Sequence, residues 1–400
     1  MGQDHSTMES DGRTHDDLVN REPEVSFDNE DTMFVPNRYR GVYRVSSAGQ
    51  LRQRPNAHYP RRERMSVSPL QVESLPLQAD GTCDERAVPA AYQCRSASPA
   101  TEDAHTWIRE RRDVLQQQLE ATGVILFRGF GLQTPEDFDR FVSAFGEKNF
   151  PYEESLSNAV RVVRTERVFS ANEAPPEVTI FLHHEMAQTP ISPRKLFFFC
   201  EIAASEGGAT PVCRSDLLLE RLAEEVPQFV ADCESKGLKY TNVMPGQDDA
   251  SSGMGRSWRS TLRASDHAEA EDKLSRLSYS WEWLDDDCLR ATTPVLPAVR
   301  EISPGRRSFF NQLIAASKGW KDSRNDPSKA IIHGDGQPLD QQAVFRATEL
   351  AQKFTYNVAW QPGDVAMVDN CISMHARQPF RGTRKVWASL AGAERNAIAD

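Results

Sequence analysis

The stretch of residues 178–200 reads VTIFLHHEMAQTPISPRKLFFFC, and it contains the clearest structural pattern in the chain. β-Branched and aromatic residues dominate Val178–Leu182 and Leu196–Cys200, and turn-forming residues separate the two runs. Such runs are typical of short strands, so we expect two strands joined by a loop here.

Two histidines and a glutamate directly follow the first of these strands. Alternate residues of a strand share a face, so His183 and Glu185 are expected to point to one side and His184 to the other. A histidine and a carboxylate on one face supply two ligands of a facial triad, which takes its third ligand from elsewhere in the chain. His375 is suited to this role, because it follows a tight turn and an apolar run. A single H-x-E also arises by chance, and His184 stays open as an alternative ligand.

Short strands recur through the rest of the chain, with helices between them. The pattern predicts a mostly β fold with flanking helices, in which a jelly-roll (double-stranded β-helix) core carries a long insertion over about residues 240–300. An ordered insertion of this length is typical of a lid. Further strands are expected at Val160–Val163, Ser308–Phe310 and Val386–Leu390, and helices at Ser215–Glu225, Ala268–Arg276 and Gln341–Lys353.

Ahead of these strands, we expect a helix, a strand and a second helix. Apolar residues repeat with a helical period through Trp107–Ala121, and Val124–Phe127 is typical of a short buried strand. Thr134 is suited to cap a helix that begins at Pro135.

The composition indicates an acidic intracellular enzyme. The net charge is −11 and the pI is about 5.4, so nucleic-acid and membrane partners are not expected. The N-terminus has no signal-peptide pattern, and no apolar run approaches the roughly 18 residues of a membrane span. Seven scattered cysteines without a C-x-x-C pair favour free thiols and a cytoplasmic location. Residues 1–65 are polar, and we expect a partly disordered extension there, followed by a single domain over residues 66–400.

Several motifs occur in the order in which one enzyme superfamily has them. They are GVILFRGFGLQTPEDFDRFVSAFG at Gly123–Gly146, HHEMAQTPISPRKLFFFC at His183–Cys200, GGATP at Gly207–Pro211, GRSWRST at Gly255–Thr261, FFNQ at Phe309–Gln312, and the segment Asp369–Arg384. On these motifs the chain resembles the taurine dioxygenase/clavaminate synthase-like superfamily, and within it the branch of syringomycin-type hydroxylases. The resemblance covers about residues 105–395.

The resemblance implies a mononuclear iron oxygenase. The expected cofactors are Fe(II), 2-oxoglutarate as cosubstrate and O2, and the expected co-products are succinate and CO2. His183, Glu185 and His375 take the positions of the iron ligands. Relatives that halogenate have a small residue in place of the carboxylate ligand, so the presence of Glu185 argues against halogenation.

The resemblance also implies a 2-oxoglutarate site. Thr210 would hydrogen-bond a carboxylate of 2-oxoglutarate, and an arginine after His375 would bind the far carboxylate of 2-oxoglutarate. A planar guanidinium suits this role because it donates two parallel hydrogen bonds to a carboxylate. Arg384 is the preferred candidate because it precedes the last strand, and Arg381 is the fallback.

The substrate is expected to be a small molecule, in the resembled branch an amino acid, free or bound to a carrier, in specialised metabolism. Arg256, Trp258, Arg259 and Asn311 are the candidate pocket residues. The reaction is expected to be hydroxylation or an oxidative cyclisation such as C–N closure to an aziridine. Two alternatives remain: a cupin-type metal isomerase or epimerase, and an inactive relative that serves as a scaffold.

Overall fold

The computed structural model describes residues 70–396, except positions 80, 152–155, 158–160, 172, 250–254, 320–323 and 325–329. The predicted extension over residues 1–65 therefore lies outside the described residues. The first residue of the predicted strand Val160–Val163 lies outside them as well.

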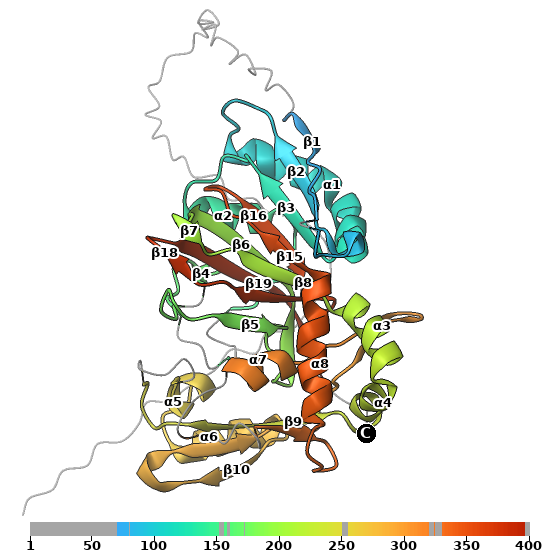
Figure 1. Cartoon of the computed structure of the whole chain (residues 1–400). Coiled ribbons are helices and arrows are strands. Elements are labelled where there is room, and N and C mark those ends of the chain that lie inside the picture. The colour runs from blue at the N-terminus through green and yellow to red at the C-terminus, as the bar shows by residue number, and fades with distance from the viewer. Residues whose placement is uncertain are drawn as a thin grey trace, which may run out of the picture. The chain divides into compact units, whose positions relative to one another are not determined.

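A large sheet of seven strands dominates the fold (Figure 1). All its neighbouring strands pair antiparallel except β2 and β3, which pair parallel and are linked through the helix α1. In sheet order the strands are β1 (Val72–Ser74), β2 (Ala90–Cys94), β3 (Val124–Arg128), β16 (Val365–Asp369), β6 (Ile191–Ile202), β19 (Lys385–Arg395) and β4 (Phe169–Ser170).

Helices α1 (Thr101–Thr122) and α2 (Pro135–Ser143) pack on one face of this sheet. Their apolar residues join those of β3, β6 and β16 in one hydrophobic cluster, which is the burial that the helical period predicts. Thr134 caps α2 as expected, in a reciprocal capping box with Asp137. α1 ends at Gly123, whose φ of 77° suits glycine, and a Cβ there would lie 2.3 Å from Ser373 Oγ.

A smaller antiparallel sheet packs against the other face of the large one. Its strands, in order, are β15 (Thr355–Val358), β8 (Thr210–Arg214), β17 (Ser373–Arg377) and β5 (Ile180–His183). A second hydrophobic cluster joins residues of both sheets, among them Phe198 and Val368 on one side and Val212 and Val358 on the other. The prediction of a mostly β fold with flanking helices is confirmed, and the paired sheets are consistent with a jelly-roll core.

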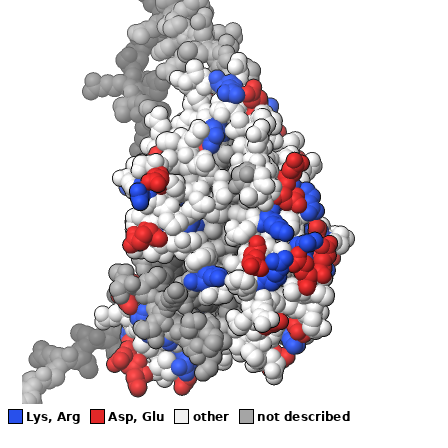
Figure 2. All heavy atoms as spheres, in the orientation of Figure 1, with Lys and Arg blue, Asp and Glu red and all other residues white. Residues whose placement is uncertain are grey.

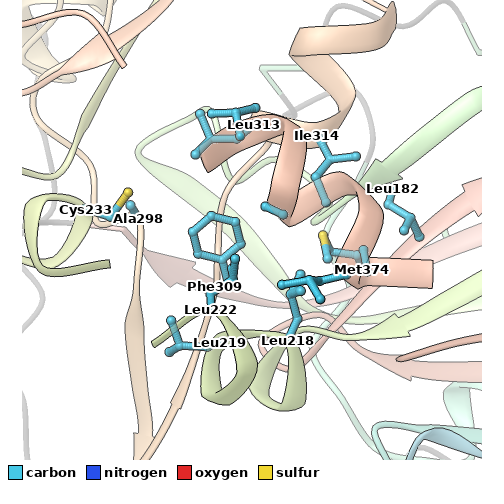
Figure 3. Packing of buried hydrophobic residues seen from close by; sticks show 14 of the residues in the cluster. Leu182, Leu218, Leu219, Leu222, Cys233, Ala298, Phe309, Leu313, Ile314 and Met374 are labelled. Carbon is cyan, nitrogen blue, oxygen red and sulfur yellow. The ribbon is translucent and has the colours of Figure 1, made fainter. Parts of the chain in front are cut away.

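Four helices cover the outer side of the smaller sheet: α3 (Ser215–Glu225), α4 (Pro227–Lys236), α7 (Leu313–Gly319) and α8 (Gln341–Ala351). The predicted helices at Ser215–Glu225 and Gln341–Lys353 are thus present. Figure 3 shows Leu182 of β5 and Met374 of β17 in the hydrophobic cluster beneath these helices. Each residue directly precedes a histidine, so both histidines are turned to the opposite face of the sheet.

The described residues of the predicted insertion form an α/β unit. It holds α5 (Trp258–Leu262), α6 (His267–Arg276) and the strands β9 (Leu238–Met244), β10 (Ser280–Trp283) and β11 (Leu289–Thr292), which share a hydrophobic cluster. Its sheet gains a fourth strand, β14 (Ile331–His333), from outside the predicted range of residues 240–300. In Figure 1 these elements lie together at the lower end, away from α1 and α2.

The remaining elements are short. They are the hairpin β12 (Arg300–Ser303) and β13 (Arg306–Ser308), the pair β7 (Glu206–Gly207) and β18 (Phe380–Arg381), and the 3-10 turns η1 (Glu85–Ala87), η3 (Asp285–Asp287) and η4 (Gln352–Phe354). The predicted strand at Ser308–Phe310 is wrong beyond Ser308, because Phe309 and Phe310 leave the hairpin and are fully buried. Of the strand predicted at Val160–Val163, the described residues form only an isolated bridge from Val163 to Phe169.

Acidic and basic side chains are interspersed on the face seen in Figure 2. Several of them pair across helices, as Arg346 of α8 does with Glu225 of α3. All seven cysteines lie in the described residues, and none of them forms a disulfide. Among the helices of the described residues, none has the length and apolar character that a membrane crossing requires.

Candidate metal centre

Three side chains converge at the end of β5. His183 is the last residue of β5, Glu185 lies in the turn that follows, and His375 lies on β17, where it pairs directly with His183. One potential ligand atom from each of the three lies within 4.8 Å of the other two. The carboxylate of Glu185 is 3.6 Å from His375 Nε2, and the two imidazole rings are 4.3 Å apart between centroids. The structure therefore brings together the three residues that were predicted from the sequence as metal ligands.

The protonation of the two histidines suits metal binding. Nδ1 of His183 donates a hydrogen bond of 2.7 Å to the carbonyl of Phe181, which leaves the lone pair of Nε2 for a ligand. Burial lowers the pKa of His183 and lowers that of His375 well below its ordinary value. Both rings are thus neutral near pH 7, and the neutral form is the one that binds metals.

His184 is not part of this group. It is fully buried, its Nδ1 donates to the carbonyl of Asn370, and its ring lies 4.7 Å from that of Phe310. Burial also lowers its pKa to about 3, so it is uncharged. His184 is turned away from His183 as expected, although β5 ends at His183 and the turn that follows sets its direction.

Asn370 holds the turn that carries Glu185. Its Oδ1 accepts a hydrogen bond from the Glu185 backbone N–H at 2.8 Å, and its Nδ2 donates to the carbonyls of Glu185 and Pro193. The turn needs this support because Met186 has a φ of 58°, a left-handed conformation that methionine rarely adopts. The sequence analysis did not predict a role for Asn370. A polar amide directly after the buried strand β16 could have indicated one.

Arg161 is a second residue that sequence reasoning missed. Its Nη2 lies 3.4 and 3.3 Å from the two carboxylate oxygens of Glu185, and both side chains are almost fully buried. Its guanidinium also lies over the ring of Phe169. The sequence placed Arg161 in a strand and offered no sign of this contact.

A cavity opens beside the two histidines. Its lining includes Thr210 of β8 and Arg384, which are in contact: Arg384 donates to the Gly208 carbonyl at 2.9 Å and to Thr210 Oγ1 at 3.4 Å. The indole of Trp360 also donates to Thr210 Oγ1. Burial, together with the nearby charge of Arg377, lowers the pKa of Arg384 to about 10.

The other two arginines after His375 are engaged elsewhere. Arg377 lines the same cavity, but its guanidinium donates to the carbonyls of Ala174, Pro175 and Val178. Arg381 is exposed and pairs with Glu206 on the neighbouring strand β7. Of the three, the geometry favours Arg384 as a partner for a carboxylate in the cavity.

The four predicted substrate residues do not line this cavity. Arg256 donates to the Ser157 carbonyl, and Arg259 stacks on Trp258 and pairs with Asp287. Trp258 is fully buried in the core of the insertion. Asn311 is buried too, where it bonds the Ala298 carbonyl and the backbone N–H of Leu313 at the start of α7.

The residues present fit iron and 2-oxoglutarate. Two neutral imidazoles and one carboxylate form the donor set of a facial triad, and Nε2 of His375 faces the Glu185 carboxylate. Within the described residues, Arg384 has no carboxylate partner, although it is partly buried at the cavity. A dicarboxylate beside the metal would supply that partner.

The family model and the 40% identical relative agree with this chemistry. The model of the family described as taurine catabolism dioxygenase TauD, TfdA family matches residues 95–390. A clavaminate synthase-like protein of Arabidopsis thaliana is 40% identical over 284 residues, which are 71% of this chain and 86% of that protein. The dapdiamide synthesis protein DdaC of Enterobacter agglomerans is 27% identical over 292 residues, 69% of this chain and 84% of its own. A solved taurine dioxygenase from Burkholderia xenovorans superposes with a TM-score of 0.44 at 16% identity, covering 80% of this chain and 89% of that one.

Proposed function

Because this chain belongs to the TauD/TfdA family of dioxygenases, we propose that His183, Glu185 and His375 bind its single Fe(II) ion. The protein is a 2-oxoglutarate-dependent dioxygenase, with iron as cofactor and 2-oxoglutarate as cosubstrate. The observation that carries the site assignment is the convergence of the three side chains beside a cavity that Arg384 also lines. When bound, iron and 2-oxoglutarate supply the oxidising power, as O2 is consumed, 2-oxoglutarate becomes succinate and CO2, and a substrate C–H bond is oxidised.

The residues of this chain would bind 2-oxoglutarate, orient the metal ligands and exclude water. Arg384 and Thr210 are placed to hold the far carboxylate of 2-oxoglutarate, and Trp360 fixes the Thr210 hydroxyl. Phe198 and Val386 form an apolar wall of the cavity, which helps to keep water from the reacting atoms. Asn370 holds the Glu185 turn in place, as positioning of metal ligands requires.

We further propose an amino acid or amino-acid derivative, free or carrier-bound, as the substrate, with hydroxylation or C–N ring closure as the outcome. The family resemblance and the names of the relatives, a clavaminate synthase-like protein and a dapdiamide synthesis protein, support this class. The insertion would serve as a lid over the cavity. We also propose a cytoplasmic location and a single domain over residues 66–400.

The test begins with anaerobic, Fe(II)-loaded protein titrated with 2-oxoglutarate. We expect a visible metal-to-ligand charge-transfer band, and we expect Arg384→Ala to raise the 2-oxoglutarate concentration needed for it by at least about 10-fold, since a buried carboxylate loses a charged donor. Arg381→Ala is the matched control and should leave the titration unchanged. The reverse result would move the carboxylate site to Arg381. Iron-loaded protein without a band would favour the isomerase reading, and protein that takes up no iron would favour the scaffold.

Amino acids added to the same complex test the substrate class. Binding beside the iron should shift the band, and the amino acid that shifts it should also stimulate succinate formation in air. A panel of free and carrier-tethered amino acids that does neither would overturn the substrate class while leaving the iron site intact.

A further inference from the structure

Residues 161–163 have an inverted pattern of burial. The side chain of Arg161 is only 6% exposed, whereas Val162 and Val163 are 60% and 44% exposed. A charged side chain is rarely buried unless a partner compensates its charge, so a buried arginine beside exposed valines indicates a specific role. The partners of Arg161 include the carboxylate of Glu185, which is one of the three proposed metal ligands.

The position of the Arg161 guanidinium is fixed by the edge of the large sheet. The backbone N–H of Val162 donates to Ser170 Oγ at 2.9 Å, and the N–H of Ser170 donates to the Val162 carbonyl at 2.8 Å, so this segment is bound to β4. The guanidinium also lies over the ring of Phe169 on the same strand, with Cζ 5.3 Å from the ring centroid. Arg161 is therefore held beside Glu185 by contacts that do not involve the metal ligands.

The charge of Arg161 acts on all three proposed ligands. Its Nη2 lies at almost equal distances, 3.4 and 3.3 Å, from the two carboxylate oxygens of Glu185. Burial is the main cause of the lowered pKa values of His183 and His375, and the positive charge of Arg161 lowers both further. A charge that acts on each ligand should also act on whatever those ligands bind.

The cavity beside the ligands has an excess of positive charge. Arg161 lines it together with Arg377 and Arg384, and none of the described residues in its lining is acidic. While the metal centre is empty, Arg161 and Glu185 compensate each other's charge. A divalent metal adds two positive charges to this buried pair, and a nearby guanidinium repels the metal and attracts an anion. The same side chain should therefore oppose metal binding and favour binding of the dianion 2-oxoglutarate.

We propose that Arg161 is a positioning residue that couples the two binding steps of the metal centre. It holds the Glu185 carboxylate in place while the centre is empty, weakens metal binding, and strengthens 2-oxoglutarate binding once the metal is present. This inference rests on the proposed function, because it requires the metal beside Glu185. An arginine with a purely structural role would behave differently, since its loss would distort the ligands and weaken both steps.

Two titrations of the full-length protein test this coupling. Metal-free protein is titrated with Mn(II), and electron paramagnetic resonance measures the free ion. Mn(II)-saturated protein is then titrated with 2-oxoglutarate in a calorimeter. Arg161→Gln removes the charge and keeps an N–H donor, so it should bind Mn(II) at least about 10-fold more tightly and 2-oxoglutarate at least about 10-fold more weakly.

Two further variants are the controls. Arg161→Lys keeps the charge, and an ammonium can replace the single nitrogen that contacts Glu185, so both affinities should stay within about 3-fold of those of the unmodified protein. Arg164→Gln makes the same substitution as Arg161→Gln in the same segment, at an arginine that pairs with Glu136 on the surface. It should change neither affinity.

The two affinities of Arg161→Gln must change in opposite directions. Weakening of both, a change in only one, or no change in either would overturn the proposal. If Arg161→Gln does not fold, Arg161→Lys decides, because a loss of more than about 3-fold in either affinity would show that charge alone does not explain the role of Arg161.

Failure of the proposed function has a different signature. The iron site itself is wrong if the unmodified protein does not bind Mn(II), or if His183→Ala binds Mn(II) equally well, and the role of Arg161 then fails with it. Mn(II) binding that depends on His183, without opposite changes in Arg161→Gln, overturns only the role of Arg161.

Discussion

His183 and His184 are neighbours in the chain, yet only His183 faces the carboxylate of Glu185. We therefore predict that His183→Ala lowers the affinity for Mn(II), a redox-stable substitute for iron, by at least about 100-fold, because a ligand is lost. His184→Asn should keep the affinity within about 10-fold and instead reduce stability, since a buried ring that packs on Phe310 is lost. Electron paramagnetic resonance of free Mn(II) measures both. Equal losses in the two variants would contradict the triad.

A buried ion network provides a prediction that depends on pH. Asp216 accepts hydrogen bonds from Arg214 and Arg306, and its side chain is 5% exposed. Burial alone would raise the pKa of Asp216, but the hydrogen bonds and charges of the two arginines outweigh it, and the net pKa is lowered. A lowered pKa means that the carboxylate stabilises the fold above its unfolded value of about 4, and that this stability is lost as the pH falls through the folded value.

Asp216→Asn should accordingly reduce the free energy of unfolding at pH 7 by about 3 kcal/mol, because the buried guanidinium of Arg214 and the partly buried one of Arg306 lose their counter-charge. Urea unfolding at a series of pH values checks this. The difference between variant and unmodified protein should shrink below about pH 4. A difference that stays constant with pH would mean that packing, not charge, is what the substitution removes.

The sequence was most informative where the chemistry is local. The H-x-E spacing correctly grouped His183 with Glu185, although β5 ends at His183 and it is the following turn, held by Asn370, that positions Glu185. Arg161, Asn370 and Trp360 were missed because each acts on a residue in a segment that only the fold brings near. Arg256 and Arg259 show the opposite error, because the sequence predicted a site role for them and neither lines the cavity beside the histidines. An arginine that bonds to other parts of the protein has the same sequence signature as one that binds a ligand.

At the scale of elements, the N-terminal cap of α2 was predicted correctly from the local sequence. Asp137 N–H donates to Thr134 Oγ1 and Thr134 N–H donates to the Asp137 carboxylate, each at 3.1 Å. Thr134→Ala should therefore lower stability by about 1 kcal/mol, while Thr134→Ser, which keeps the oxygen, should cost far less. Thermal unfolding of both variants measures the difference. Equal losses would assign the effect to the threonine methyl group rather than to the cap.

Elements that depend on distant partners were predicted less well. β2 is half-apolar and pairs in parallel with β3 across a whole helix, so its short sequence gave no periodic signal. β14 completes the sheet of the insertion from some 30 residues beyond the predicted range. The Phe309–Phe310 pair looked like a strand because aromatic runs favour strands, but the rings are buried in irregular backbone instead.

At the scale of the whole molecule, the ligands should stabilise the fold, because they bind the native state alone. Mn(II) at about 100 times its dissociation constant should raise the free energy of unfolding by about 2.7 kcal/mol, and 2-oxoglutarate should add a further increment only when metal is present. Denaturant unfolding with and without a chelator measures both. Arg384→Ala should retain the metal increment and lose most of the second one. A 2-oxoglutarate increment in the absence of metal would contradict a shared site.

The direct pairing of His183 with His375 has a consequence for how the chain reaches its native state. The two strands are almost half the chain apart in sequence, so they meet only after a large loop has closed, and such contacts form slowly. A slip of one residue between β5 and β17 would turn one imidazole into the hydrophobic cluster beneath the helices. The rate at which refolding protein binds metal therefore reports when β5 and β17 reach their native register.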